Sequence, residues 1–327
     1  MLFIHGIGHF HPENQIDNLF FQDLGIGTDP AWILERVGIR SRRTVLPLDY
    51  IVQTKNENPS LASQVSLYTN AQTGAQAANL AMKRAGISPN QIGMVISGGC
   101  SPEYLIPAEA CILASELNLE ATAFDLSSAC SSFAAQIHFL RGMRTESLPD
   151  FILLMSCENN TRSVDYRDRG TAILWGDCSA ATIVSKKVPS KMRVTLSTLS
   201  SDPSGWMKVK IPAGGHFSQS GAQVQSFAIR KTLATLEILQ KQAHSGFKQN
   251  YFIGHQANLR MLNQVCEKAR ISKQMHLHNV EDFGNCGAAG APSVLSQNWD
   301  RFQSGDQITV ALVGSGLTWS GFVVQVD

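Results

Sequence analysis

The sequence predicts an α/β fold in which parallel sheets pack against helices. Short apolar segments are expected to form buried strands, at residues 3–8, 94–96, 121–126, 192–199, 307–312 and 321–326. Longer segments with helical periodicity separate these strands, at residues 73–85, 107–117, 133–143, 225–240 and 259–269. Strands that alternate with helices are typical of this fold class. The 327 residues, 43% of them hydrophobic, are enough for one large domain or two of average size.

A short helix is also marked between residues 29 and 39. It would begin at Asp29 and Pro30 and end at Gly38, because Asp caps a helix N-terminus, Pro fits the first turn and Gly fits the C-terminal cap. Trp32 and Arg36 are four residues apart and therefore share one face of this helix. Spacing alone favours a tryptophan that packs on the core beside a solvated arginine.

Two polar segments interrupt the alternating pattern. Residues 51–64 lack periodicity, and we expect a loop there. Residues 185–190 contain two lysines and a proline and are the best candidate for a connector. We therefore divide the chain into an N-terminal half, residues 1–188, and a C-terminal half, residues 189–327. No sequence similarity between the two halves is visible.

Composition excludes several classes of protein. A net charge of +1 with dispersed Lys and Arg gives no support for nucleic-acid binding. The seven cysteines are widely spaced without a CxxC pair, so neither a metal site nor a disulfide framework is expected. We expect reduced thiols and a cytoplasmic protein. The N-terminus lacks the features of a signal peptide, and no apolar run approaches the roughly eighteen residues of a membrane span.

Cys130 is the strongest candidate for a reactive group. It follows the strand predicted at 121–126 and precedes the helix predicted at 133–143, among small residues that allow a tight turn. The unpaired N–H groups and the dipole at a helix N-terminus favour the thiolate, which is the nucleophilic form of cysteine. The alternative is an inert buried cysteine, which is the commoner case. Cys130 is therefore a nucleophile only if other catalytic groups meet it.

Two distant polar residues are candidates for those groups. His255 stands at the end of an apolar segment and opens a polar turn, and Asn285 lies in a turn followed by small residues. A cysteine with a histidine and an asparagine far away in sequence is the pattern of a nucleophilic site assembled by folding. Each residue alone would more often be structural. The neighbouring Cys286 has no supporting pattern as a nucleophile.

Together these blocks resemble the β-ketoacyl-acyl-carrier-protein synthase III family of the thiolase-like superfamily. The resemblance covers the strand turn around Cys130, the D-R-G-T block at 168–171, H-Q-A-N-L-R at 255–260 and F-G-N at 283–285, in family order across almost the whole chain. It implies a thiolase-like fold of two similar βαβαβαββ halves in a five-layered αβαβα architecture. The N-terminal half would carry Cys130, and the C-terminal half would carry His255 and Asn285 as the rest of a Cys-His-Asn site.

The resemblance also implies a reaction. Cys130 would accept an acyl group from acyl-coenzyme A, and His255 and Asn285 would stabilise the enolate formed when malonyl-acyl-carrier protein loses carbon dioxide. The N–H groups of Cys130 and Gly316 would form the oxyanion hole. Acyl-coenzyme A is a substrate, so no cofactor is expected, and a homodimer is implied.

Binding residues follow from the same resemblance. Trp32 and Arg169 would enclose the adenine of coenzyme A, with Arg36 beside them. The carrier protein, which is acidic, would dock on basic residues of the helix after His255, namely Arg260, Lys268 and Arg270; otherwise these form a solvated face.

Other functions remain open at this point. A related acyltransferase or ketosynthase could use the same Cys-His-Asn site in a secondary-metabolite or cofactor pathway. Tyr104, Leu105 and Ile106, near the expected acyl pocket, hint at a primer other than acetyl. The chain could also be a silent partner subunit of a condensing heterodimer, although such a subunit has no chemical need for Cys130, His255 and Asn285 together.

Overall fold

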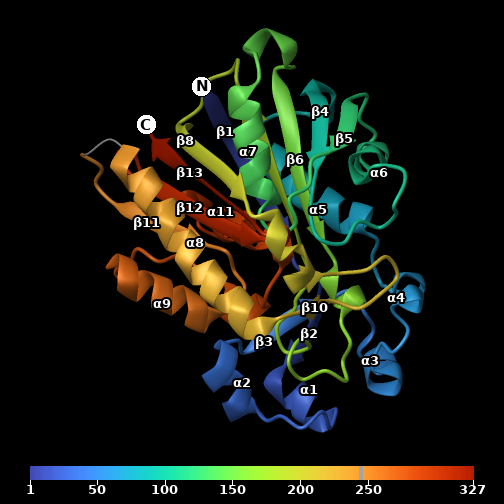
Figure 1. Cartoon of the computed structure of the whole chain (residues 1–327). Helices are drawn as coiled ribbons and strands as arrows, with labels where there is room; N and C mark the ends of the chain where they lie inside the picture. The colour runs from blue at the N-terminus through green and yellow to red at the C-terminus, as the bar shows by residue number, and fades with distance from the viewer. Residues whose placement is uncertain (243–245) are drawn as a thin grey trace.

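A nine-stranded mixed sheet forms the centre of the molecule in the computed structural model, which describes residues 1–242 and 246–327 (Figure 1). The strand order across the sheet is β11 (Asn250–Gly254), β12 (Gln307–Gly314), β13 (Thr318–Val326), β8 (Met192–Ser201), β1 (Leu2–Phe10), β7 (Cys178–Ser185), β6 (Phe151–Glu158), β4 (Ile92–Ser97) and β5 (Thr122–Asp125). The mixed α/β fold predicted from the alternating pattern is confirmed.

The two ends of the sheet repeat one pairing scheme. In the N-terminal part, β4 pairs in parallel with β5 and β6, and β6, β7 and β1 follow in antiparallel pairs. In the C-terminal part, β11 pairs in parallel with β12 and forms a parallel bridge to His276, and β12, β13 and β8 follow in antiparallel pairs. A short antiparallel contact between β1 and β8 joins the parts. The boundary that we drew after residue 188 falls between β7 and β8.

Helices form three layers around the two parts of the sheet. The helices α5 (Asn70–Ala85) and α6 (Glu109–Glu116) cover the outer face of the N-terminal strands, and α8 (Gly221–Gln242) and α9 (Leu259–Ala269) cover the C-terminal strands (Figure 1). Between them lie α7 (Ser132–Gly142) and α11 (Gly290–Gln297). The helix α7 packs on β8 and β13, whereas α11 packs on β1 and β7. Each central helix therefore packs on strands of the other half, in the five-layered order.

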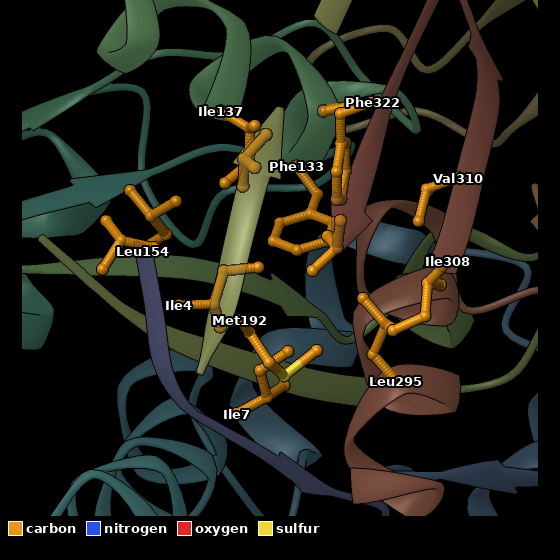
Figure 2. Close-up of a cluster of buried hydrophobic side chains, with 14 of the residues drawn as sticks. Ile4, Ile7, Phe133, Ile137, Leu154, Met192, Leu295, Ile308, Val310 and Phe322 are labelled. Atoms are coloured by element: carbon orange, nitrogen blue, oxygen red, sulfur yellow. The ribbon is translucent and has the colours of Figure 1, made fainter. Parts of the chain in front are cut away.

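Alternation along the strands creates these layers. In β12, Ile308 and Val310 face the central layer together with Phe133 of α7, while Ala311 faces the outer cluster with helix α8. Figure 2 shows the central cluster, where the rings of Phe133 and Phe322 meet edge to face with centroids 5.4 Å apart. Successive strand residues point to opposite faces, so a strand buried on both faces reads as continuously apolar.

The remaining elements form a cap beside the sheet. Its helices are α1 (Asn18–Asp23), α2 (Pro30–Val37), α3 (Leu48–Thr54), α4 (Pro59–Val65) and α10 (Val280–Phe283), and its strands are β2 (Asn14–Asp17), β3 (Ser41–Thr44), β9 (Val209–Lys210) and β10 (Ser218–Gln219). In residues 1–242 and 246–327, no helix combines the length and the apolar character that a bilayer crossing requires.

The short helix predicted at residues 29–39 is confirmed. The loop predicted at residues 51–64 is wrong. The Asp29 side chain caps α2 and Gly38 ends it with φ of 69°. The expected loop instead contains the end of α3 and all of α4, each only seven residues long and each with one buried residue, Ile51 or Ala62. Two turns are too short to show helical periodicity, so tertiary packing rather than pattern decides their structure.

Candidate active site

The candidate site lies at the carboxyl ends of parallel strands from both parts of the sheet. Cys100 follows β4, Cys130 follows β5 and Glu158 ends β6. On the other side, His255 follows β11, and Asn285 follows the segment that bridges to β11. Carboxyl ends of parallel strands meet at one edge of a sheet, which is where α/β proteins place their ligands. Residues 28 to 185 positions apart in the sequence therefore come together.

A tight turn presents Cys130 at the start of the central helix α7. Ala129 has a positive φ of 48°, uncommon for a residue other than glycine, and Ser131 is the N-cap of α7. The Ser131 hydroxyl lies 2.7 Å from the Ser128 hydroxyl and 2.8 Å from that of Thr318. These hydroxyls tie the turn to the start of β13. The predicted position of Cys130 at a helix N-terminus is confirmed.

Two neighbours act on the Cys130 thiol. The Cys100 sulfur lies 3.3 Å from the Cys130 sulfur, and its hydrogen bond is the largest influence that lowers the pKa of Cys130. The imidazole of His255 lowers the pKa further by its charge and by a hydrogen bond, against the effect of burial. The pKa of Cys100 is raised, because its proton is held against Cys130. Cys130 is thus the thiol of the pair that ionises.

His255 is held by its neighbours in the H-Q-A-N-L-R segment. The buried Gln256 donates to the Gly254 carbonyl at 2.8 Å and accepts from the Asn279 N–H at 3.1 Å, so this side chain fixes the loop in both directions. Asn258 then caps α9 by accepting from the Met261 N–H. The histidine side chain is only 6% exposed.

Asn285 presents its amide in a defined orientation. Its backbone N–H donates to the Leu174 carbonyl at 2.8 Å, and its carbonyl accepts from the Gly176 N–H at 3.1 Å. Its side-chain oxygen accepts from the Gly287 N–H at 3.1 Å. Because the oxygen is engaged there, the amide NH₂ group is the end left to donate to a ligand.

Cys130, His255 and Asn285 line one cavity of about 370 Å³. Its wall also contains apolar side chains and a smaller number of polar ones, which include Leu174, Trp175, Phe217, Phe227, Met261, Arg36, Gln219, Gln225, Asn258 and Ser315. A mostly apolar cavity with a few convergent polar groups is the usual form of a small-molecule site. The three side chains predicted from the sequence are therefore brought to one site.

Trp175 in this wall carries an unused hydrogen-bond donor. Its side chain is 4% exposed and packs against the Phe217 ring, with centroids 4.6 Å apart. Within the part of the chain that the structure describes, the indole N–H has no hydrogen-bond partner. A buried donor of this kind costs about 1–3 kcal/mol when it stays unpaired, so the site favours a ligand or a solvent molecule with an acceptor there.

The loop predicted to carry the oxyanion group reaches the same cavity. Gly314, Ser315 and Leu317 line it, on both sides of Gly316. Gly316 has φ of 131°, a backbone conformation that favours glycine. The role of the Gly316 N–H itself stays a prediction.

Trp32, Arg36 and Arg169 form a surface cluster near the cavity. The guanidinium of Arg36 lies 5.2 Å and that of Arg169 lies 5.0 Å from the centroid of the Trp32 ring. Arg36 also lines the cavity, and Arg169 donates to the Gly27 carbonyl at 2.5 Å. An aromatic base could enter between Trp32 and Arg169 only if the arginine moved aside. The three residues predicted to bind coenzyme A are thus adjacent, and their role stays a prediction.

The predicted docking residues are exposed at or near α9. Arg260 in its first turn lies 3.4 Å from the Leu34 carbonyl of α2, and Lys268 lies in its last turn. Arg270 is the left-handed residue that ends the helix. All three are available to an acidic partner.

Tyr104, Leu105 and Ile106 do not belong to the cavity, contrary to our expectation. They are 58%, 84% and 85% exposed. The segment lies between β4 and α6, in the loop that also carries Cys100, and none of its three residues lines the cavity. These residues therefore give no information on the primer within one subunit.

Sequence reasoning missed Cys100 and Glu158. The Cys100 N–H donates to both Glu158 carboxylate oxygens at 3.0 Å, and the Ala288 N–H donates to the same carboxylate at 2.7 Å. Glu158 therefore connects the Cys100 loop with the turn that follows Asn285. Burial raises the pKa of Glu158 to about 8. The available signal was the polar ending of an apolar strand at residue 158.

Comparisons with known proteins agree with this geometry. Residues 124–203 match the family model for 3-oxoacyl-[acyl-carrier-protein] synthase III, and residues 239–326 match the model for its C-terminal part. The chain is 28% identical to beta-ketoacyl-[acyl-carrier-protein] synthase III of Clostridioides difficile, over 98% of this chain and 97% of that protein. It is 26% identical to the protein of the same name in Aquifex aeolicus, over 98% of both chains.

Solved structures show the same fold. The crystal structure of 3-oxoacyl-[acyl-carrier-protein] synthase III from Aquifex aeolicus superposes with a TM-score of 0.87 at 25% identity, covering 99% of this chain and all of that one. A priming beta-ketosynthase from the R1128 polyketide pathway gives a TM-score of 0.84 at 23% identity, covering 100% of this chain and 97% of that one. The thiolase-like architecture expected from the sequence is confirmed.

Proposed function

Because this chain belongs to the 3-oxoacyl-[acyl-carrier-protein] synthase III family of acyltransferase-type condensing enzymes, we propose that it joins an acyl group from acyl-coenzyme A to malonyl-acyl-carrier protein. The product is a 3-oxoacyl-acyl-carrier protein, and carbon dioxide leaves. One observation carries the proposal: Cys130 from one half and His255 and Asn285 from the other line a single cavity.

In the loading step, the Cys130 thiolate attacks the thioester carbonyl of acyl-coenzyme A. A bond forms between the Cys130 sulfur and the carbonyl carbon, and the thiolate of coenzyme A leaves. Negative charge develops on the carbonyl oxygen, and the N–H groups of Cys130 and Gly316 stabilise it by donating hydrogen bonds to this oxygen. The lowered pKa of Cys130 supports this role, because more of the thiol is ionised at neutral pH.

In the condensation step, malonyl-acyl-carrier protein loses carbon dioxide and leaves an enolate, whose carbon attacks the acyl group on Cys130. Hydrogen-bond donors on the thioester oxygen stabilise this enolate. His255 and the NH₂ group of Asn285 supply them. The engagement of the Asn285 oxygen by Gly287 supports this assignment, since it leaves the amide nitrogen free to donate.

Delivery of the two substrates is assigned to surface residues beside the cavity. Trp32, Arg36 and Arg169 hold the coenzyme A nucleotide, which enters as part of a substrate and not as a resident cofactor. Arg260, Lys268 and Arg270 receive the acidic carrier protein. Their positions near the cavity support these assignments. Arg36 lines the cavity, and Arg260 lies against α2, the helix that carries Trp32 and Arg36.

We also assign a homodimer and a cytoplasmic location. The last strand of the N-terminal sheet, β5, has β4 as its one neighbour among the described strands, and Leu105 and Ile106 are highly exposed. An open strand edge with apolar residues favours pairing with a second copy. Free cysteines throughout the chain agree with a reducing compartment.

Mass spectrometry of the intact protein tests the proposed function. The protein is exposed to a panel of acyl-coenzyme A thioesters, and the mass of the adduct identifies the primer. Cys130→Ala should take up no acyl group, whereas Cys111→Ala, which changes an exposed cysteine, should load normally. Normal loading of Cys130→Ala would disprove the mechanism.

A further inference from the structure

Cys130 has a second thiol in contact with it that the condensation reaction does not require. The Cys100 and Cys130 sulfur atoms are 3.3 Å apart, although they come from different loops. A disulfide bond is about 2.0 Å long, so closure needs an approach of little more than an ångström. Both thiols are free in this structure.

The Cys100 loop is fixed on two sides. Its N–H is held by Glu158 at the end of β6. Its neighbour Gly99 accepts at its carbonyl from the Ser127 hydroxyl at 2.9 Å, and Ser127 belongs to the turn that carries Cys130. The loops that carry the two thiols are therefore held next to one another by hydrogen bonds.

The pair is chemically asymmetric. Cys130 lines the cavity and is reachable by a small molecule, whereas Cys100 is not part of that wall. The pKa of Cys130 is lowered and that of Cys100 is raised, each chiefly by the hydrogen bond between them. Cys100 is half-buried and Cys130 is buried, but an oxidant that enters through the cavity meets the Cys130 thiolate first, with Cys100 beside it as a protonated thiol.

We propose that Cys130 is a site of reversible oxidative modification, with Cys100 as its resolving thiol. The Cys130 sulfur attacks a hydroperoxide, the O–O bond breaks, and Cys130 becomes a sulfenic acid while the peroxide is reduced to an alcohol or water. The Cys100 sulfur then attacks the Cys130 sulfur, the S–O bond breaks, and water leaves with the Cys100 proton. A dithiol reduces the resulting disulfide and restores both thiols.

This modification blocks acyl loading while it lasts. It also protects the nucleophile, because a sulfenic acid without a nearby thiol proceeds to sulfinic and sulfonic acids that a dithiol does not reverse. Cys178 and Cys286 form a second hydrogen-bonded pair, in which the pKa of Cys178 is lowered and that of Cys286 is raised, but neither of them lines the cavity. Cys111 is exposed.

The test treats the whole protein with hydrogen peroxide and measures intact mass and linked peptides. Wild type should lose about 2 Da, yield one peptide pair joined between Cys100 and Cys130, and regain acyl loading after dithiothreitol. Cys100→Ser should instead gain about 32 or 48 Da on Cys130 and should not recover. Cys111→Ser is the matched control and should behave as wild type.

Three outcomes would overturn the inference. The first is a wild-type link between Cys178 and Cys286 in place of Cys100 and Cys130. The second is irreversible oxidation of Cys130 in wild type as fast as in Cys100→Ser. The third is the absence of any link in wild type. The wild-type peptide map decides the matter even if the serine variant fails to fold. Acyl adducts are measured separately, so a protein that loads acyl groups but forms no link contradicts this inference alone.

Discussion

Replacing Glu158 by glutamine should remove a component of stability that depends on pH. Glu158 is fully buried, and the resulting desolvation, with the nearby Cys130 charge, raises its pKa from 4.5 to about 8. The folded protein therefore holds a proton on Glu158 at pH values at which the unfolded chain has released it. Stability contributed by this group is present below about pH 4.5 and declines as pH rises toward about 8. Glutamine keeps a carbonyl acceptor for the Cys100 and Ala288 N–H groups but cannot ionise.

The size of the effect follows from linkage. Each pH unit within the window changes the free energy of unfolding by about 1.4 kcal/mol, with half that slope at the pKa itself. Between pH 6 and pH 8 the wild type should therefore lose about 2 kcal/mol relative to Glu158→Gln, and the difference should level off near pH 9. Glu109 and Asp177 are also buried, with pKa values raised to about 7 and about 6, but they are unchanged in both proteins and cancel in the difference.

Urea unfolding at a series of pH values between 6 and 9 measures this difference. Glu146→Gln is the control, because the Glu146 side chain is 81% exposed beside Arg144, and it should follow the wild-type curve. Equal pH slopes in wild type and Glu158→Gln would show that Glu158 is ionised in the folded protein at neutral pH, and the reasoning from burial would be wrong.

Three further predictions concern the site. His255→Ala should still form the acyl adduct, although more slowly because His255 lowers the pKa of Cys130, and should lower condensation by at least about 100-fold because a donor to the enolate is lost. Adduct mass and product formation from malonyl-acyl-carrier protein measure the two steps, and a complete absence of adduct would contradict the division of roles. Trp32→Ala should raise KM for acyl-coenzyme A about tenfold with kcat nearly unchanged, because it removes a stacking surface outside the reacting centre. An unchanged KM would show that Trp32 does not bind the coenzyme A nucleotide. Gly284→Ala should lower the free energy of unfolding by about 1–3 kcal/mol, as measured by urea unfolding. Gly284 has φ of 71°, and a Cβ there would lie 2.8 Å from the Leu174 carbonyl oxygen. A variant as stable as the wild type would show that the turn adapts.

Local signals in the sequence predicted the elements that carry the site. The helix predicted at 259–269 is α9 with the same limits, and the strand and helix around Cys130 differ from the prediction by one residue at each end. Asn258 and Asp29 both cap helices, as their positions before apolar periodic segments indicate. Such signals depend on residues a few positions apart, which the sequence displays directly.

Local signals could not predict which distant segments lie side by side. Cys100 meets Cys130 because β4 and β5 are parallel neighbours with Ser97 opposite Asp125, and this register is not written in either segment alone. The common pairing scheme of the two halves was invisible for a similar reason. The two halves share the order in which their strands pair, but the side chains at matching positions differ. For example, Cys100 follows β4, whereas His255 follows the matching strand β11.

The matching positions of β4 and β11 give the reactive sulfur one flanking group from each half. A thiol stands on one flank and an imidazole on the other, and they are anchored separately, by Glu158 and by Gln256. The Glu158 anchor also accepts from the Ala288 N–H in the turn after Asn285, so it supports both flanks, whereas Gln256 supports the imidazole flank alone. Substitution of Gln256 is therefore expected to disturb one side of the sulfur, and substitution of Glu158 to disturb both.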